Sequence, residues 1–338
     1  MDTARLEMND AQDRWNQIIQ IAGRAPSTHN TQGWRIKVVS DKQAYLLYDK
    51  ERTLPAEDIH GDFNIINMGI FERGVEIAAN SLGYGASCKF ILPKNQFFRH
   101  TNVASITLKE SDAERDPSIL ELFLARRTSR LPYDGRNIEG DDLSFLKNLT
   151  STRGHDFSWT QDDNEVEWYI ELNANTISED LQNSYVRKEL RDWMRFSRNE
   201  AEEKRDGLWA ECMNQNPLEM RLATACPGIL EIPPLKKIFR KYYMRTQAGT
   251  PAIGWIEGSI GTREEQFEAG RFLLDFWLKL TEFKIWMLPF GSLYTNMKSN
   301  KMVGERTKAP KFWLIFRMGY GPTPPESFRL EPEKLFIT

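Results

Sequence analysis

Apolar positions in the first third of the chain switch between helical and strand-like spacing. A stripe that includes Trp15, Ile18 and Ile19 repeats at helical intervals and predicts a helix that stops at Gly23 and Pro26. Alternating apolar positions after it predict strands. In order, the expected elements are a helix over 10–23, strands over 34–40 and 44–49, a helix over 64–82, and strands over 86–92 and 103–109. Together they predict a layer of strands with helices packed on it.

A second run of the same kind begins near residue 116. Thr262 and Glu265 form a capping box, which predicts the start of a long helix that ends near Thr281. The other elements expected here are helices over 117–125 and 141–149 and strands over 284–288 and 312–318. Between them, residues 163–245 are charged and helix-prone and show no clear strand. The second run therefore echoes the first and carries a large helical insertion, without a residue-level repeat.

These patterns predict an α+β fold made of two unequal halves. The first half covers residues 1–115 and the second covers 116–338, with a helical insertion around 163–260. The part of this insertion over 200–260 is a candidate lid, because prolines interrupt it and basic and aromatic side chains alternate near its end.

Composition and charge exclude several classes of function. The 338-residue chain has a net charge of -3, which gives no case for general nucleic-acid binding. No apolar run approaches the ~20 residues of a membrane helix, and the N-terminus lacks the apolar core of a signal peptide. The three cysteines, Cys88, Cys212 and Cys226, form no metal-binding or disulfide pattern. We therefore expect a cytoplasmic protein with no metal site, nucleic-acid partner or membrane partner.

A polar loop follows the first predicted helix. Pro26 fixes the backbone, and Ser27, Thr28 and Asn30 then present short hydrogen-bonding groups that can bind a phosphate or the polar edge of a flavin. Gln32 extends this polar surface. Taken alone, the segment is more simply interpreted as an ordinary loop between a helix and a strand.

A cluster of arginines follows the helix predicted over 117–125. Arg126, Arg127 and Arg130 carry guanidinium groups, which bind phosphate in a bidentate manner, and Thr128 adds a neutral donor. Taken alone, this segment is more simply interpreted as cations that complement the dipole at the end of a helix.

The two segments together resemble the motifs of the nitroreductase-like FMN flavoproteins, and most closely those of the Acg-like branch. Residues 48–55, which read Tyr-Asp-Lys-Glu-Arg-Thr-Leu-Pro, resemble that branch's D-x-x-R-x-L-P segment. Further similar stretches are 67–69, 82–86, Asp206-Gly207, 277–278, 288–289 and 316–320, followed by Pro324, Pro325 and Arg329. The chain departs from the branch at Gly33, which replaces a proline, within 282–284, where a glycine is missing, and at Ser327, which replaces a cation.

The order of the two motifs is reversed relative to ordinary members of this family. In those homodimers the arginine motif comes first, and one subunit supplies it while the other supplies the Pro-Ser-x-x-Asn loop. The reversal implies a nitroreductase fold built as a fused internal pseudo-dimer, with mixed sheets, flanking helices and one surviving FMN site. The resemblance assigns FMN binding to Pro26, Ser27, Thr28, Asn30, Gln32, Arg126, Arg127, Thr128, Arg130, Pro289, Gly291 and Arg329. Arg329 would close over the phosphate, and His29 is a candidate proton donor.

The activity implied by the resemblance is FMN-dependent oxidoreduction. Hydride would pass from NAD(P)H through flavin N5 to a small nitroaromatic or quinone-like acceptor, in a ping-pong scheme. Two alternatives stay open, which are a flavin-dependent dehydrogenase or oxidase of a biosynthetic intermediate and a non-catalytic protein that binds or sequesters FMN. The fused chain would act as a monomeric pseudo-dimer or as a homodimer.

Overall fold

The computed structural model describes residues 13–92, 101–111, 116–226, 228 and 232–337. The first sheet has four antiparallel strands in the order β1-β2-β4-β3. Its strands are β1 (Trp34–Val38), β2 (Gln43–Tyr48), β3 (Tyr84–Phe90) and β4 (Thr101–Glu110). The helix over residues 13–22 and α2 (Asp62–Ser81) pack on this sheet and bury Trp15, Ile18 and Phe71 completely. The part of the first expected helix before residue 13 lies outside the described residues.

The second sheet repeats this arrangement. Its four antiparallel strands have the order β5-β8-β10-β9, and α10 (Arg263–Glu282) packs on it. The strands are β5 (His155–Thr160), β8 (Ala252–Gly258), β9 (Trp286–Pro289) and β10 (Phe312–Gly319). The expected capping box of α10 is present, since Glu265 N donates to Thr262 Oγ1 at 3.2 Å and Thr262 N donates to Glu265 Oε2 at 2.8 Å.

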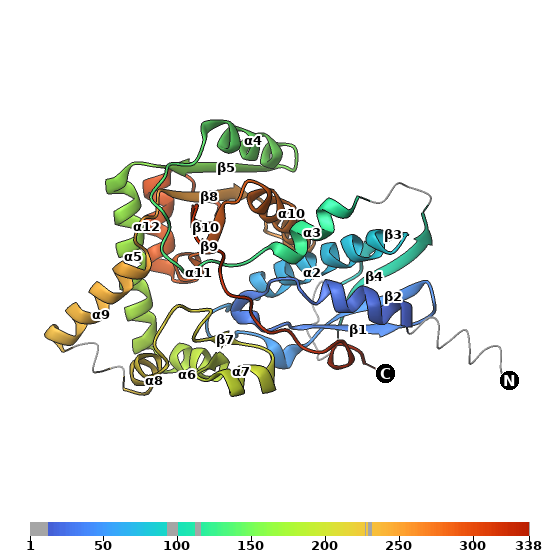
Figure 1. Cartoon of the computed structure of the whole chain (residues 1–338), viewed down its shortest axis with the longest axis horizontal. Coiled ribbons are helices and arrows are strands. Elements are labelled where there is room, and N and C mark those ends of the chain that lie inside the picture. The colour runs from blue at the N-terminus through green and yellow to red at the C-terminus, as the bar shows by residue number, and fades with distance from the viewer. Residues whose placement is uncertain (1–12, 93–100, 112–115, 227, 229–231, 338) are drawn as a thin grey trace.

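The two long helices cross in the middle of the molecule, between the two sheets (Figure 1). The crossing is reciprocal. A methyl group on Gly69 of α2 would overlap the carbonyl oxygen of Phe267, and one on Gly270 of α10 would overlap that of Ile66. Each glycine is the eighth residue of its helix. The equal positions and the matching strand orders relate the two halves by a pseudo-twofold axis.

The α+β class and the two fused halves expected from the sequence are therefore confirmed. The boundary between residues 115 and 116 stays a prediction, because residues 112–115 lie outside the described part of the chain. The C-terminal arm reaches back across the halves to the edge of β1, where Ile36 N donates to Leu335 O and Ile337 N donates to Ile36 O.

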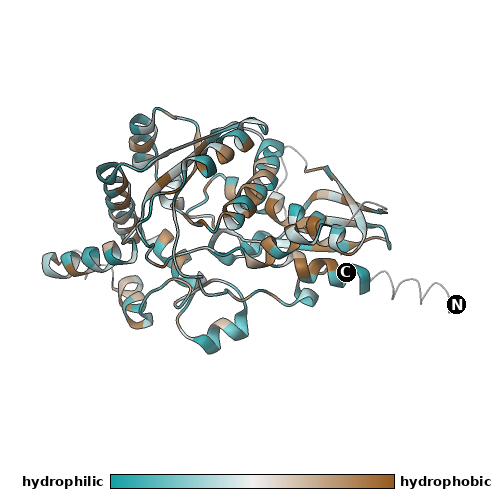
Figure 2. Ribbon diagram, turned by 45° about the horizontal axis from the view of Figure 1, so that its top comes forward, coloured by the Kyte–Doolittle hydropathy of each residue, from teal (hydrophilic) through white to brown (hydrophobic). Residues whose placement is uncertain are grey.

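Helices join and extend the two halves. After the first sheet come α3 (Pro117–Ala125) and α4 (Gly140–Ser151). The insertion contains α5 (Asp163–Gln182), α6 (Ser184–Trp193), β6 (Met194–Arg195), α7 (Arg198–Lys204), β7 (Leu208–Trp209), α8 (Pro217–Ala225) and α9 (Pro233–Thr246). After β9 come α11 (Gly291–Thr295) and α12 (Met297–Thr307). Short 3-10 turns are η1 (Thr28–Asn30), η2 (Lys50–Arg52) and η4 (Pro332–Lys334). Figure 2 shows hydrophobic segments toward the interior and hydrophilic ones on the outlying helices.

The sequence missed several features of the second half, among them α11 and α12. β5 and β8 were not expected as strands, and β8 contains two glycines, which disfavour strands in isolation. Gly254 is required there, because a Cβ atom would lie 2.8 Å from the Phe157 ring and 2.9 Å from the Phe316 ring. The insertion, expected to hold no clear strand, contains the short parallel pair β6 and β7. These strands depend on tertiary partners that local spacing does not reveal.

Candidate functional site

The loop after the first helix adopts a tight, unusual backbone. His29, Asn30 and Gln32 have φ angles of 50°, 55° and 53°, in the left-handed region that non-glycine residues rarely occupy. Local hydrogen bonds hold this shape, since Asn30 N donates to Ser27 O at 2.9 Å and Gln32 N donates to Ser27 Oγ at 3.0 Å. The loop is also tied to α2, because Thr28 N donates to Asn67 Oδ1 at 3.3 Å. Three strained positions in one short loop indicate a functional constraint.

The arginine turn is fixed to the second sheet. α3 ends at Ala125, and the turn then runs along β9, where Ser129 N donates to Met287 O at 3.1 Å. Arg317 of β10 is fully buried and donates to Ser129 O at 3.2 Å and to Leu131 O at 2.8 Å. The turn therefore belongs to the second half, whereas the polar loop belongs to the first.

The fold brings the two motifs together at two adjoining cavities. The larger has a volume of about 350 Å³ and lies between the polar loop, α2, α10 and the insertion. The smaller, which we call the arginine hollow, has a volume of about 70 Å³. Both cavities are lined by Pro26, Ser27, His29, Thr128, Arg130, Leu208 and Met213. The arginine hollow is further lined by Arg24, Asn30, Arg126, Arg127 and Arg329.

The arginine hollow concentrates positive charge without enough carboxylates to balance it. Within the described part of the chain, Arg126, Arg130 and Arg329 form no ion pair with a carboxylate, while Arg24 and Arg127 share Glu326. Burial, followed by repulsion from Arg329, lowers the pKa of Arg126 well below its usual value. Burial, followed by other arginines, lowers the pKa of Arg329 to about 9. Burial likewise lowers the pKa of Arg130 to about 10. Such a cluster stabilises a bound anion.

Arg126 shows this imbalance most clearly. Its side chain is 4% exposed and lies over the Trp277 ring, with 4.7 Å between the guanidinium carbon and the ring centroid. Its Nε and Nη1 atoms are buried and have no hydrogen-bond partner among the described residues. Arg329 Nε is buried and unpartnered in the same way. Buried donors without acceptors are costly, so these atoms are suited to hold an acceptor-rich group.

The remaining predicted site residues lie at different positions relative to the two cavities. Gln32 is fully buried and lines neither cavity; its amide bridges Arg205 O and Leu330 N and so connects the loop to the insertion and the C-terminal arm. Arg127 lines the hollow, but its guanidinium donates to Glu326 Oε2 at 2.8 Å. Pro289 and Gly291 line the larger cavity where β9 runs into α11.

Asp206-Gly207 connects the insertion to the polar loop. Gly207 N donates to Asn30 O at 3.2 Å, and Asn30 Nδ2 donates back to Gly207 O at 3.3 Å. Asp206 pairs with Arg52 of the D-x-x-R segment and with Arg195, whose Nη2 lies 2.6 Å from Asp206 Oδ1. The resemblance noted separately at 48–55 and at 206–207 therefore reflects one ion-pair cluster that holds the insertion against the site.

Sequence reasoning missed several residues of the site. Arg24 directly precedes the loop, and its position beside Pro26 was an available signal. Asn67 and Trp277 lay in stretches already noted, without a role. Glu57 gave no local signal, because only the fold brings it to within 3.3 Å of His29, measured from Nε2 to Oε2.

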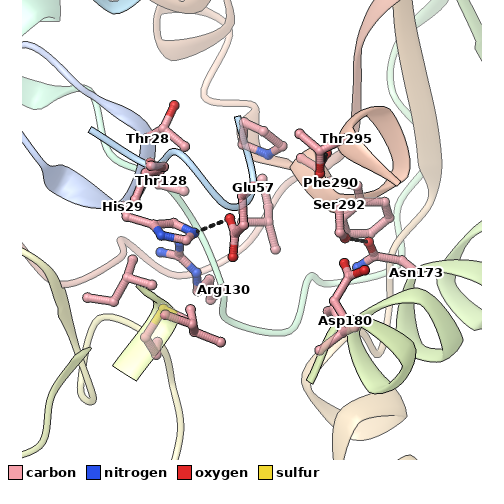
Figure 3. Close-up of a pocket in the computed structure, with 18 of the residues that line it drawn as sticks. Thr28, His29, Glu57, Thr128, Arg130, Asn173, Asp180, Phe290, Ser292 and Thr295 are labelled. Carbon is pink, nitrogen blue, oxygen red and sulfur yellow. Dashed lines mark hydrogen bonds and ion pairs between the residues drawn. The ribbon is translucent and has the colours of Figure 1, made fainter. Parts of the chain in front are cut away.

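The larger cavity has two polar walls facing each other (Figure 3). On one wall His29 meets Glu57; on the other, Ser292 Oγ donates to Asn173 Oδ1 at 2.8 Å. Burial raises the pKa of Glu57 to about 8 and lowers that of His29 to about 4. At neutral pH this pair is therefore uncharged, with its proton on Glu57.

The counterpart position on the other side of the helix crossing holds no comparable loop. The polar loop between the first helix and β1 is replaced there by the short turn Thr152–Gly154 between α4 and β5. Counting from the crossing glycines, the cavity-lining residues Asn67, Ile70, Leu273 and Trp277 correspond to Glu268, Arg271, Glu72 and Glu76. These charged residues form an ion-pair network in which Arg271 contacts all three glutamates.

Comparison with known sequences gives partial matches. No protein family model matches the chain. The putative NAD(P)H nitroreductase acg of Mycobacterium tuberculosis (strain CDC 1551 / Oshkosh) is 32% identical over 118 residues, or 34% of each chain. An uncharacterized protein of the same strain is 31% identical over 120 residues, again 34% of each. The chain thus spans about a third of the length of the curated relatives it matches. The expected similarity to Acg nitroreductases is confirmed.

Solved structures align more weakly. A nitroreductase-like family protein from Bacillus cereus aligns with a TM-score of 0.35 and 16% identity, covering 67% of this chain and 98% of that one. The FMN-dependent nitroreductase NfnB from Mycobacterium smegmatis, in complex with NADPH, gives 0.32 and 13%, covering 60% and 87%. The description of the fold therefore rests on the strand order and the helix crossing given above. None of the described helices is long and apolar enough to cross a membrane.

Proposed function

We propose that this chain binds one FMN in the paired cavities and acts as an FMN-dependent oxidoreductase. The observation that carries the proposal is the arginine hollow, where Arg126, Arg130 and Arg329 converge without carboxylate partners among the described residues, beside the Pro-Ser-x-x-Asn loop. The phosphate would occupy this hollow, and the ring system would occupy the larger cavity, whose volume of about 350 Å³ lies in the usual range for ligand pockets.

The residues present fit such a cofactor. The orphaned nitrogens of Arg126 and Arg329 supply donors for a phosphate, and Thr128 adds a neutral one. Pro26, Ser27 and Thr28 would contact the ring edge and the ribityl chain, while Asn30, whose Oδ1 is buried and unpartnered, faces the hollow. Pro289 and Gly291 would border the reactive edge of the ring. Gln32 would support the loop without lining either cavity.

When bound, FMN would accept hydride from NAD(P)H at N5 and pass it to an acceptor. The chain's own part is to position both substrates and exclude water. One cavity must then receive NAD(P)H and the acceptor in turn, because the sequence has no G-x-G-x-x-G motif for a separate dinucleotide domain. This supports a ping-pong scheme, with nitroaromatic or quinone-like acceptors. The name of the relative, putative NAD(P)H nitroreductase, agrees with this donor.

One cofactor per chain follows from the two sides of the crossing. The counterpart side lacks the loop and fills its space with the network around Arg271, so we assign it no cofactor. A single chain would then act as a pseudo-dimer, with halves divided between residues 115 and 116, and association into a homodimer would be unnecessary for forming the site.

The test is flavin retention by the double variant Arg126→Ala and Arg130→Ala. The purified wild-type protein should be yellow, with one FMN per chain by absorbance, and the double variant should be colourless. Arg198→Ala is the control, because Arg198 is an exposed arginine of α7 that lines neither cavity. Full flavin stoichiometry in the double variant would rule out the site.

A second candidate function is FMN sequestration without turnover. The insertion supplies Leu208, Met213 and Met220 to the wall of the larger cavity, so it covers the space that a nicotinamide would need. Anaerobic mixing with NADPH or NADH distinguishes the two functions. Rapid bleaching of the flavin band supports the oxidoreductase. A flavin that dithionite reduces but neither nucleotide does supports sequestration, or an enzyme that oxidises a biosynthetic intermediate.

A further inference from the structure

His29 and Glu57 form a polar pair on the wall of the larger cavity. His29 Nε2 lies 3.3 Å from Glu57 Oε2, and their side chains are only 17% and 22% exposed. Both residues line the cavity. Glu57 lines only the larger cavity, whereas His29 also lines the arginine hollow beside Arg130, so the pair borders the anion-binding end.

Different elements hold the two partners in place. His29 sits in η1 with its left-handed φ of 50°, in the loop that Asn67 ties to α2. Glu57 is positioned from α6, because the Glu189 carboxylate accepts hydrogen bonds from Ala56 N at 2.8 Å and from Glu57 N at 3.0 Å. A catalytic group needs such support from surrounding elements to hold its geometry.

The surroundings of Glu57 keep a proton on it. Burial is the largest cause of its raised pKa, and the carboxyls of Asp180 on α5 and Asp58 on its own loop add to it. Glu189 lies behind the loop, and its own pKa is raised by burial and by Glu57. The pKa of His29 is lowered by burial and then by Arg130, so His29 is neutral and accepts the Glu57 proton at Nε2.

Resting on the function proposed above, we propose that Glu57 supplies the proton for the acceptor through His29, with Glu189 as a positioning residue. Reducing a quinone to a hydroquinone adds two electrons and two protons. Both electrons and one proton arrive together as hydride. The second proton passes from His29 Nδ1 to the acceptor oxygen while Glu57 Oε2 gives its proton to His29 Nε2, and the pair regains a proton from water before the next turnover.

His29 Nδ1 is the second reason to place the acceptor here. With Nε2 accepting from Glu57, the ring hydrogen resides on Nδ1, which is buried and has no partner among the described residues. An acceptor oxygen or the cofactor would satisfy this donor. The opposite wall, with Ser292 and Asn173, would orient the far end of the same substrate.

The first test compares two acceptors in Glu57→Gln. The glutamine amide still donates to His29 but has no proton to transfer. We expect kcat for a quinone to fall about 100-fold, as for loss of a general acid, with unchanged flavin content. Ferricyanide takes single electrons and no proton, so its reduction should be unchanged. In the wild type, kcat with quinone should fall as the pH rises through about 8. This alkaline limb of the pH profile should be absent in the variant. Equal loss with both acceptors, or a retained limb, would overturn the assignment.

The second test does not need turnover. Infrared spectroscopy of the oxidised, unreacted protein should detect a protonated carboxyl band that disappears with a midpoint near pH 8. The band should be absent in Glu57→Gln and retained in the control Glu179→Gln, which alters an exposed carboxylate paired with Lys298. Absence of a band titrating near pH 8 in the wild type overturns the proposal even if Glu57→Gln does not fold. A protein with this band that retains no FMN would instead refute the cofactor assignment.

Glu189→Gln tests the positioning role. Glutamine keeps one acceptor oxygen for two backbone amides, so Glu57 should be held less well and quinone kcat should fall about tenfold, less than in Glu57→Gln. Removing the negative charge of Glu189 should also lower the pH at which kcat with quinone falls. An unmoved limb with lower kcat would mean that Glu189 supports the fold only.

Discussion

The two sides of the α2–α10 crossing begin from the same geometry and end with opposite chemistry. On one side, Asn67, Ile70 and Trp277 border a cavity. On the other, the equivalent positions carry Glu268, Arg271 and Glu76, and the charges satisfy one another. On the first side, buried arginines without carboxylate partners among the described residues lie beside an open cavity. On the second side, Arg271 is paired with glutamates of the same network.

This contrast distinguishes the proposed binding site from a network of internal ion pairs. Arg126 is buried with unpartnered nitrogens, so its charge is balanced only when an anion binds. Arg271 contacts Glu72, which is fully buried, and Glu76, with 2.9 Å between Arg271 Nη2 and Glu76 Oε1. Removing one arginine should therefore affect stability in the opposite direction from removing the other.

Arg271→Met should have the largest effect on stability. It leaves Glu72 buried and without its cation, so we expect the free energy of unfolding to fall by about 3–5 kcal/mol. Denaturant unfolding measures this. Arg198→Met is the control, because Arg198 and Glu202 form an exposed pair one helical turn apart, and its loss should cost under about 0.5 kcal/mol. Similar losses in the two variants would show that the network contributes no more than a surface pair.

Gly270→Ala should come next, because it disturbs both sides at once. The added methyl would overlap the carbonyl oxygen of Ile66 and force the helices apart, at a cost of about 1–3 kcal/mol. Gly140→Ala is a matched control, since no atom lies within 4 Å of a Cβ there. Thermal unfolding compares them. A Gly270→Ala protein as stable as the control would mean that the crossing is looser than this contact implies.

Sequence patterns predicted the elements of the first sheet and the long helix of the second half because their signals are local. The capping box at Thr262 was enough to place the start of α10, and α3 was expected with the bounds it has. β8 escaped because Gly254 and Gly258 weaken a strand in isolation. Gly254 is there to make room for rings from neighbouring strands, which is a tertiary requirement.

In the candidate site too, local sequence signals could be read and tertiary requirements could not. The polar loop and the arginine turn could be identified because each carries its chemistry in consecutive residues, and the fold brings them together as expected. Gln32 sits in the same loop but points away from the cavities, a difference set by its φ of 53° that spacing alone cannot reveal. Glu57 could not be found, because its raised pKa comes from burial and from Asp180 on a distant helix.

Arg126→Met should change the stability of the protein in the opposite direction from Arg271→Met. Removing a buried, unpartnered cation should stabilise the cofactor-free protein slightly, by up to about 1 kcal/mol, while FMN affinity falls about 10- to 100-fold. Arg127→Met provides the contrast, since Arg127 already pairs with the half-exposed Glu326, and its removal should lower stability slightly. Melting curves with and without FMN measure both quantities. If Arg126→Met destabilises the cofactor-free protein as Arg271→Met does, Arg126 has a structural role and the contrast between the two sides fails.

The smallest expected effect is a pH dependence of the stability that only the cavity side shows. The pKa of Glu57 is raised in the folded protein to about 8, so the folded state holds its proton where the unfolded state has lost it, and stability falls as pH rises toward 8. The pKa of His29 is lowered to about 4, which makes stability rise with pH up to about 6.5, its unfolded value. The two opposing slopes overlap below pH 6.5, and only Glu57 of this pair acts above it.

Between pH 6.5 and 8 the cofactor-free protein should therefore lose about 1–2 kcal/mol of stability. Glu57→Gln should abolish this loss, because an amide does not titrate. Glu76→Gln is the matched change on the other side of the crossing. It alters the network around Arg271 and leaves the His29–Glu57 pair intact, so the loss between pH 6.5 and 8 should remain. Denaturant unfolding at several pH values measures both. A slope that survives in Glu57→Gln would place the titrating group elsewhere and remove the chemical distinction between the two sides that the His29–Glu57 pair provides.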